Sequence, residues 1–280
     1  MFRLILLAAA LLAVAPRPAA GQPRRTAAPT GIAYYDVDRL YDTVASPFYA
    51  DDDYTPAGRL RWTAARYRRK IRAVAAVVDS MAMPLTALWG VENEGVVRDL
   101  VAAAAGDYVY LHRTLDSRDG LDFALLYHGD RFFPHYDEAG RRYLYVEGTL
   151  RRGARRDTVG LLLCSDPRMV RPLLAALRDE RPGIPLLVAG RSEGTDAAAL
   201  GLDDITARAA AAGRGTVASH TGWRMRDRIL ADTALRLTGG EVYARPFLFD
   251  RATGLPAPTY DNRRYLGGAS GSLPVYAYFP

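Results

Sequence analysis

The sequence has 280 residues and a formal net charge of +6, and this length allows one large α/β domain with a substantial core or two small domains. Its single cysteine excludes an intramolecular disulfide, so stability must come from the core. The positive charge gives only weak support to a nucleic-acid or anionic-surface partner. Lys70 is the only lysine among 37 basic residues, and such an excess of arginine, together with alanine, is typical of a coding bias.

The first residues have the pattern of a secretory signal peptide. An apolar run at residues 4–15 follows Arg3, and Ala19 and Gly21 supply the small side chains that a signal peptidase accepts. We expect a signal peptide at 1–21, a flexible leader at 22–30 and one domain over 31–280, since no linker interrupts the rest. No later stretch approaches the ~20 apolar residues of a spanning helix. We therefore expect an exported protein without a transmembrane segment, either periplasmic or extracellular.

The first half of the mature chain alternates strand-like and helix-like patterns, which is typical of a layered α/β protein. A strand-like run at 32–35 precedes apolar residues at helical spacing over 60–81, and Pro84 terminates this predicted helix. A strand is predicted at 85–91 and a second helix at 94–105. Five strands without an intervening helix follow, which indicates antiparallel pairing; they are expected at 108–111, 122–127, 131–133, 143–150 and 158–163.

In the second half of the chain, helix-like and strand-like patterns alternate again. Pro167 opens a predicted helix to about residue 180, a strand is expected at 184–189, and Thr195 is placed to cap an alanine-rich helix to about residue 212. Strands near 227–231, 241–243 and 273–278 complete the predicted sheets. This order of elements predicts an α/β fold with two packed sheets, mixed and largely antiparallel, flanked by helices.

Several strings along the chain have counterparts in one protein family. Residues 35–42 read Tyr-Asp-Val-Asp-Arg-Leu-Tyr-Asp, where the family's first strand reads approximately Tyr-Asn-Val-Glu-Asn-Leu-Phe-Asp. Further matching strings lie at 51–58, 62–63, 66–70, 90–93, 120–127, 215–216, 223, 227–229 and 265–276. On these strings, the mature chain resembles secreted bacterial members of the endonuclease/exonuclease/phosphatase family. The resemblance implies that family's four-layer α/β sandwich, with an active site at one mouth between the sheets.

The resemblance also implies where catalytic residues should lie. Active members hydrolyse phosphodiesters or phosphomonoesters with Mg²⁺ held by carboxylates, while an Asp-His arrangement and an Asn/Asp set place and activate water. In this chain the positions of that machinery carry other residues, namely Asp36 for an Asn, Gly90 for the metal-binding Glu, Ser165 for a His, Arg191 and Glu193 within the Gly-Asp-Phe-Asn motif, and Gly271 and Ser272 for the final Asp-His. The resemblance therefore indicates degenerate catalytic motifs.

Neighbouring acids offer an alternative. Glu92 lies two residues after Gly90, on the same face of a continuing strand, and Glu193 lies two residues after Arg191. With Asp122 and Asp227 they would form a displaced Mg²⁺ site of an active nuclease or phosphatase. The remaining candidates in the remnant cleft are Asn93 and Arg141, of which Arg141 matches a family arginine and is a candidate anion ligand.

Other reactive or charged residues are expected to be structural. A hydrolase needs a base of suitable pKa, but none of the four histidines falls at a motif position, and we expect surface or strand-edge places for His112, His128, His135 and His220. Cys164 is expected to be a buried thiol rather than a nucleophile. Solvated surfaces are expected for the acids at 51–53 and for the basic clusters at 66–72 and 151–156.

The losses follow a pattern. At least five separated chemical positions change together, whereas the glycines, turn prolines, strand cores and Trp223 remain. We therefore predict a folded, catalytically inactive pseudoenzyme that needs no cofactor and acts as an exported binding or scaffold protein for an unidentified ligand or protein partner. The alternative is the Mg²⁺-dependent phosphoesterase. A third option, unrelated chemistry at Asp36, Ser165 and Arg191, lacks a nucleophile-base pair.

Overall fold

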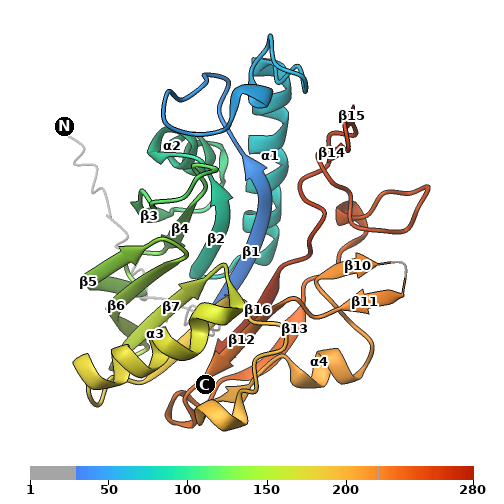
Figure 1. The fold of residues 1–280 in the computed structure, drawn as a ribbon. Helices are drawn as coiled ribbons and strands as arrows, with labels where there is room; N and C mark the ends of the chain where they lie inside the picture. Colours follow the sequence, from blue (N-terminus) through green and yellow to red (C-terminus); the bar gives the residue numbers. More distant parts are fainter. Residues whose placement is uncertain (1–29, 220) are drawn as a thin grey trace, which may run out of the picture.

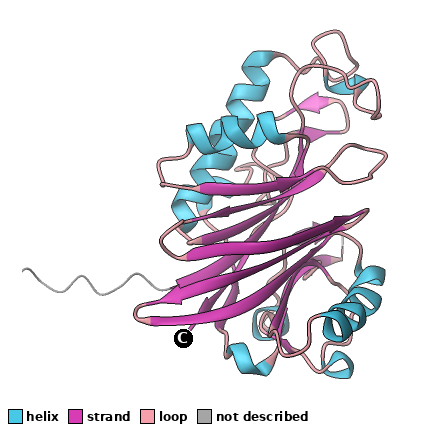
Figure 2. Ribbon diagram, turned by 90° about the vertical axis from the view of Figure 1, so that its left-hand side faces the viewer, coloured by secondary structure: helices cyan, strands magenta, loops and turns pink. Residues whose placement is uncertain are grey.

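The computed structural model describes residues 30–219 and 221–280, which form two six-stranded sheets packed together between outer helices (Figure 1 and Figure 2). The predicted four-layer α/β sandwich is confirmed. The predicted signal peptide, residues 22–29 of the predicted leader and His220 lie outside the described residues. Thr30, which was expected in the leader, already belongs to the first strand.

The first sheet has the strand order β13-β16-β1-β2-β4-β3. In this sheet only β1 and β2 pair in parallel. Helix α1, which connects them, returns the chain to the edge of the sheet at which β1 began, so that β2 runs in the same direction. The strands of this sheet are β1 (Thr30–Leu40), β2 (Leu85–Val91), β3 (Val109–Arg113), β4 (Asp122–Tyr127), β13 (Thr238–Val242) and β16 (Val275–Phe279).

The second sheet has the order β5-β6-β7-β8-β12-β9, again with one parallel pair, β7 and β8. Its strands are β5 (Phe132–Gly140), β6 (Tyr143–Arg152), β7 (Arg155–Cys164), β8 (Leu186–Arg191), β9 (Asp203–Asp204) and β12 (Asp227–Ala231). The five consecutive strands of the sequence pattern are thus divided between the sheets after β4, where a turn at residues 128–131 redirects the chain.

Helices α1 (Ala64–Met81) and α2 (Glu94–Ala103) cover the first sheet, and α3 (Pro167–Glu180) covers the second (Figure 1). Each begins at a side-chain cap: Thr63, Asn93 and Asp166 accept hydrogen bonds from backbone N–H groups of the first turn. Helix α1 ends at Met81, and the next residue, Ala82, adopts a left-handed conformation before Met83 and Pro84. It begins at Ala64, later than the pattern from residue 60 predicted.

The main apolar core fills the space between the sheets and extends beneath α1 and α2. A smaller cluster lies between the second sheet and α3, and it contains Val170, Leu174 and Leu177. Cys164 belongs to this cluster, fully buried and unpaired, and burial raises the pKa of its thiol to about 11. The prediction of a buried structural thiol is confirmed.

The predicted alanine-rich helix from Thr195 to about residue 212 is wrong. The segment instead holds a single 3₁₀ turn (Ala198–Leu200), strand β9 and the short helix α4 (Ala207–Ala211). Gly201 adopts a left-handed φ of 65° that stops the first turn. Asp204 then accepts hydrogen bonds from both the N–H and the hydroxyl of Thr206, which holds the chain in a turn.

The remaining elements are short. They are the hairpins β10–β11 (Val217–Ser219, Gly222–Arg224) and β14–β15 (Tyr260–Asp261, Arg264–Tyr265), and the 3₁₀ turns Asp52–Tyr54, Thr233–Leu235 and Pro246–Leu248. Within residues 30–219 and 221–280, no helix combines the length and apolar character needed to cross a bilayer.

Candidate functional site

Near the carboxyl end of β1, Asp36 is held by two arginines of the second sheet. Its Oδ2 atom accepts hydrogen bonds from the guanidinium groups of Arg191 and Arg226, each at 2.8 Å. Arg191 ends β8, and its cross-strand partner Asp227 begins the neighbouring strand β12, so Arg226 enters the site from the residue just before β12. One buried carboxylate therefore joins the two sheets through two cations.

Arg226 is the centre of this network. The same nitrogen that contacts Asp36 also donates to Asp227 Oδ2 at 2.9 Å and to Ser272 Oγ at 2.8 Å. The hydroxyl of Thr216 accepts the backbone N–H groups of both Arg226 and Asp227. The structure thus brings together four predicted site residues, Asp36, Arg191, Asp227 and Ser272, around an arginine that sequence reasoning missed.

The network is poorly solvated, and its electrostatics follow from that. The side chains of Asp36 and Asp227 are 5% and 1% exposed. Burial alone would lower the pKa of Arg226, but the carboxylates of Asp227 and Asp36 raise that pKa above its ordinary value. Arg226 therefore keeps its charge and neutralises the buried acids.

Gly90 combines the lack of a side-chain ligand with an unusual backbone conformation. Its φ is +94°, a conformation that residues with a side chain rarely adopt. A Cβ at this position would lie 3.3 Å from the backbone nitrogen of Arg39 and 3.7 Å from Oδ1 of Asp36. The backbone where the family's metal-binding Glu would stand is thus set in a geometry suited to glycine.

A bulge in β1 lies opposite Gly90. Asp38 and Arg39 both have left-handed φ angles, 51° and 58°, and the β1–β2 register shifts between Asp36 and Leu40. The ammonium group of Lys70, on α1, donates to the carbonyls of Asp38 and Arg39. Lys70 was expected on a solvated helix face, and this was wrong: it is 1% exposed, and burial lowers its pKa to about 8.

A second polar group ties the loop after β1 to the end of β2. Glu92 Oε2 accepts the N–H of Asp42 at 2.6 Å, and the carboxyl group of Glu92 is hydrogen-bonded to Asp51. Burial, followed by the neighbouring acids Asp42 and Asp51, raises the pKa of Glu92 to about 8. Asn93 caps α2 and donates to Asp42. Asp51, expected to be solvated, is 2% exposed and accepts the N–H of Ser46.

The other acids of the predicted displaced metal site are bonded elsewhere. Asp122 accepts the N–H of Leu115 and pairs with His112. His112 lies on the edge strand β3, in line with the predicted strand-edge position, and its side chain is 6% exposed. Glu193 pairs with Arg224 at 3.4 Å. Among residues 30–219 and 221–280, no group of three or more His, Cys, Asp or Glu side chains is placed to hold a metal ion.

The remaining predicted positions are peripheral to the network. Ser165 is buried after β7, and both its N–H and its hydroxyl contact the carbonyl of Arg142. Arg141 is exposed in the turn between β5 and β6. Gly271 lies one residue before Ser272, and a Cβ there would make only an ordinary contact, 3.6 Å from Pro258.

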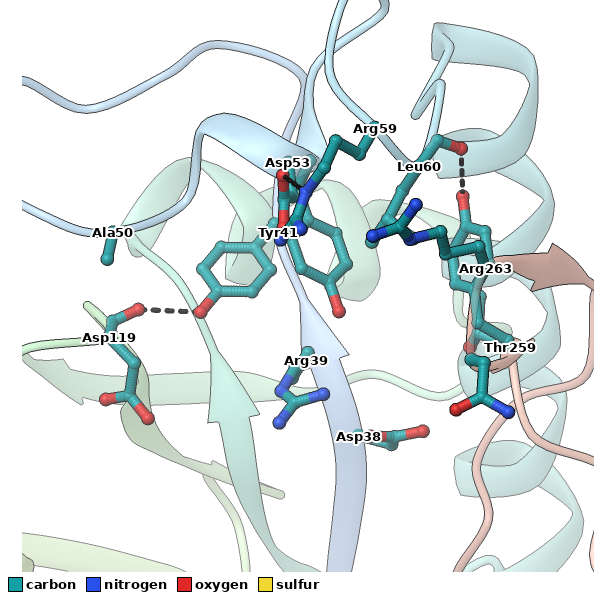
Figure 3. Close-up of a pocket in the computed structure, with 13 residues that line it drawn as sticks. Asp38, Arg39, Tyr41, Ala50, Asp53, Arg59, Leu60, Asp119, Thr259 and Arg263 are labelled. Atoms are coloured by element: carbon teal, nitrogen blue, oxygen red, sulfur yellow. Dashed lines mark hydrogen bonds and ion pairs between the residues drawn. The ribbon is translucent and has the colours of Figure 1, made fainter.

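A polar pocket of about 630 Å³ opens beside the bulge (Figure 3). Four segments form it: the end of β1, the loop that contains the Asp52–Tyr54 turn, the loop between β3 and β4, and the β14–β15 hairpin with the residue before it. Its lining residues are Asp38, Arg39, Tyr41, Ala50, Asp53, Tyr54, Arg59, Leu60, Asp119, Thr259, Tyr260, Asn262 and Arg263. Sequence reasoning did not select this pocket, because its members are scattered over more than two hundred residues.

The residues present do not fit the family's Mg²⁺. Gly90 offers no oxygen ligand from a side chain, and the carboxylate of Asp36 already binds two guanidinium groups. Arg191 stands where the resemblance places a carboxylate. A divalent cation would have to displace the guanidinium groups that neutralise the buried carboxylates of Asp36 and Asp227, at a large energetic cost.

Comparison with known proteins agrees with this architecture. A sequence model described as the Endonuclease/Exonuclease/phosphatase family matches residues 31–159. The fold is the endonuclease/exonuclease/phosphatase fold. A comparison with curated proteins gave no match.

Solved structures with this fold cover nearly the whole chain. An endonuclease/exonuclease/phosphatase from Bacteroides vulgatus has a TM-score of 0.58 and 14% identity, over 89% of this chain and 98% of that one. The mannosyl-6-phosphatase Bt3783 of Bacteroides thetaiotaomicron VPI-5482 has a TM-score of 0.56 and 13% identity, over 89% and 98%. Humanized D. rerio TDP2 has a TM-score of 0.56 and 14% identity, over 90% and 98%. Such low identities show the endonuclease/exonuclease/phosphatase fold alone.

Proposed function

We propose that this chain is a catalytically inactive member of the endonuclease/exonuclease/phosphatase family that acts as an exported binding or scaffold protein. One observation carries the proposal: Asp36 Oδ2 binds both Arg191 and Arg226 at 2.8 Å. Two fixed guanidinium groups supply the positive charge that metal-dependent relatives would obtain from Mg²⁺. They present no exchangeable coordination position at which water or a phosphoryl oxygen is activated.

The acid-base positions support the same proposal. Ser165 and Ser272 stand where the resemblance places histidines, and the Ser272 hydroxyl accepts a hydrogen bond from Arg226. Serine hydroxyls do not titrate near neutral pH, so they do not replace a general base or acid. Export is proposed from the apolar run and small residues at positions 4–21.

The proposal is tested by assaying the purified mature protein with plasmid DNA, bis(p-nitrophenyl) phosphate and p-nitrophenyl phosphate, each with Mg²⁺ or Mn²⁺ and with chelator. An active phosphoesterase of the same fold serves as the positive control. We expect no chelator-sensitive hydrolysis. Chelator-sensitive turnover that disappears in Glu92→Gln or Asp122→Asn would instead establish the alternative, a phosphoesterase with displaced acidic ligands.

A further inference from the structure

We propose that the polar pocket beside the β1 bulge binds a neutral carbohydrate, of about monosaccharide or disaccharide size. The inference rests on the proposed binding function and names its ligand class. The pocket's volume of about 630 Å³ lies within the range of roughly 300–1,000 Å³ that is typical of small-molecule sites. Its lining combines charged groups of both signs, an amide and three tyrosines.

The floor of the pocket is held in a strained conformation. Asp38 and Arg39 are consecutive non-glycine residues at positive φ, and the buried ammonium of Lys70 fixes both of their carbonyls. Left-handed backbone is disfavoured for residues that carry a side chain. Strain that is maintained by a dedicated buried cation is typical of functional sites. Here it turns two side chains of opposite charge into the same pocket.

The charge balance favours a ligand that both donates and accepts hydrogen bonds. Three arginines and three aspartates line the pocket, and Arg59 and Asp53 already neutralise each other. Within the described parts of the chain, the buried Oδ1 of Asp119 has no hydrogen-bond partner, and Asp38 lies half-buried in the same lining. A simple anion has no hydrogen-bond donor for these carboxylates. A sugar hydroxyl, in contrast, donates to a carboxylate and accepts from a neighbouring guanidinium.

The two side walls complete a carbohydrate site. Tyr41 and Tyr54 lie against each other with ring centroids 4.3 Å apart, and Tyr260 meets Tyr54 edge-on at 6.4 Å. Tyr41 is buried and packs against Tyr54, whereas the partly exposed rings of Tyr54 and Tyr260 offer an apolar surface to the C–H face of a pyranose. From the opposite wall, the exposed side chain of Arg263 points across the pocket (Figure 3). The neighbouring Asn262 also lines the pocket and adds an amide.

The test is saturation-transfer difference NMR on the full mature protein with methyl glycosides of mannose, glucose and galactose, and with maltose and cellobiose. Inorganic phosphate, mannose 6-phosphate and free amino acids are the comparison probes. We expect saturation transfer to at least one neutral sugar. Asp38→Asn and Arg263→Ala should each weaken its binding about tenfold or more, which corresponds to the loss of roughly 1.4 kcal/mol, while Asp52→Asn leaves it unchanged.

Asp52 is a matched control because it is an exposed acid of the same loop that does not line the pocket. Arg263 is exposed, so its variant keeps the test valid if Asp38→Asn does not fold. The inference is overturned if no neutral sugar binds, if only anions or amino acids bind, or if both pocket variants bind like the wild type. Chelator-sensitive phosphoester hydrolysis would overturn the proposed inactive role separately, without bearing on sugar binding.

Discussion

Asp36 and Asp227 are two buried carboxylates that share one cation. Arg226 contacts both, and its planar guanidinium offers several fixed donors, so a single side chain satisfies acids on different sheets. Removing one partner of a buried ion pair leaves an uncompensated charge, which costs more than the pair itself contributed. The network is therefore most sensitive at Arg226.

Replacement of Arg226 by Met should destabilise the fold by about 3–5 kcal/mol, the usual cost of breaking a buried pair. Arg224→Met is the matched control, because Arg224 and its partner Glu193 are 56% and 42% exposed. The control should cost less than about 1 kcal/mol. Urea unfolding measures both. Equal, small losses in the two variants would contradict the central role of Arg226.

Glu92 should make stability depend on pH. Its folded pKa of about 8 lies above the ordinary value of 4.5, so the folded protein keeps a proton that the unfolded chain releases between these values. The free energy of unfolding should therefore fall as pH rises from about 5 to about 8. Glu92→Gln, which is uncharged at every pH, should reduce this fall and be more stable than the wild type at pH 8.

Urea unfolding at several pH values measures this dependence. Glu180→Gln is the control, since Glu180 is exposed at the end of α3 and should leave the pH profile unchanged. If the wild-type profile is flat over this range, or if Glu92→Gln has the same slope, then the carboxyl group of Glu92 is not protonated in the folded protein.

At the scale of the element, the ends of β1 and β2 depart from regular pairing at the same level. The bulge at Asp38 and Arg39 faces the left-handed Gly90, and the ladder between β2 and β4 also shifts there, between Trp89 and Val91. A substitution at Gly90 therefore acts on the backbone of two neighbouring strands.

Gly90→Ala should destabilise the protein by roughly 1–3 kcal/mol, the cost of holding a side chain in a sparsely populated backbone conformation. Gly271→Ala is the comparison at the other glycine where the resemblance places an acidic residue. Gly271 does not have a positive φ, and a Cβ there would make only an ordinary contact. The substitution should therefore change the free energy of unfolding by no more than about 0.5 kcal/mol. Thermal or urea unfolding ranks the two. A Gly90→Ala protein as stable as the wild type would show that the bulge relaxes freely.

Lys70→Met should leave the carbonyls of Asp38 and Arg39 without their buried donor. We expect a loss of about 1–3 kcal/mol, as for other unsatisfied buried polar groups. Arg68→Met, an exposed change on the same helix, should be nearly neutral. Urea unfolding of the two variants measures the difference, and similar values would mean that Lys70 does not hold the bulge.

At the scale of the whole molecule, the midpoint of thermal unfolding should not respond to Mg²⁺. A ligand that binds only the folded state stabilises by about 2.7 kcal/mol at one hundred times its Kd. Because Arg191 and Arg226 already occupy Asp36, we expect the same midpoint with millimolar Mg²⁺ or with chelator. Differential scanning calorimetry measures it, and a chelator-reversible rise would reveal a metal site.

Most of the fold could be predicted from the sequence, because burial imposes periodicity on continuous segments. The bounds of β2, β4, β12 and α3 agree with the patterns at 85–91, 122–127, 227–231 and 167–180. The alanine-rich segment failed because alanine has helix propensity but marks no apolar face. In that segment, Gly201 and the side chain of Asp204 determine the backbone conformation.

The site was less predictable, because its partners come from distant segments. Asp36, Arg191, Asp227 and Ser272 were found through family motifs, whereas Arg226 stands in no quoted string and is one of many arginines. The burial of Lys70 could not be predicted from the sequence either. Its helix neighbours are basic and mostly exposed, and only the carbonyls of a bulge more than thirty residues away explain its position.

The geometry at Gly90 also bears on the evolution of the chain, because it disfavours the return of an acidic residue to position 90. An acid restored at position 90 would first meet a backbone that disfavours side chains, and then an Asp36 already neutralised by Arg191 and Arg226. On the proposed inactive role, each single reversal would lower stability without completing a metal site, because the other positions would still carry Arg191 and Arg226. A return to metal-dependent hydrolysis would then need several substitutions at once.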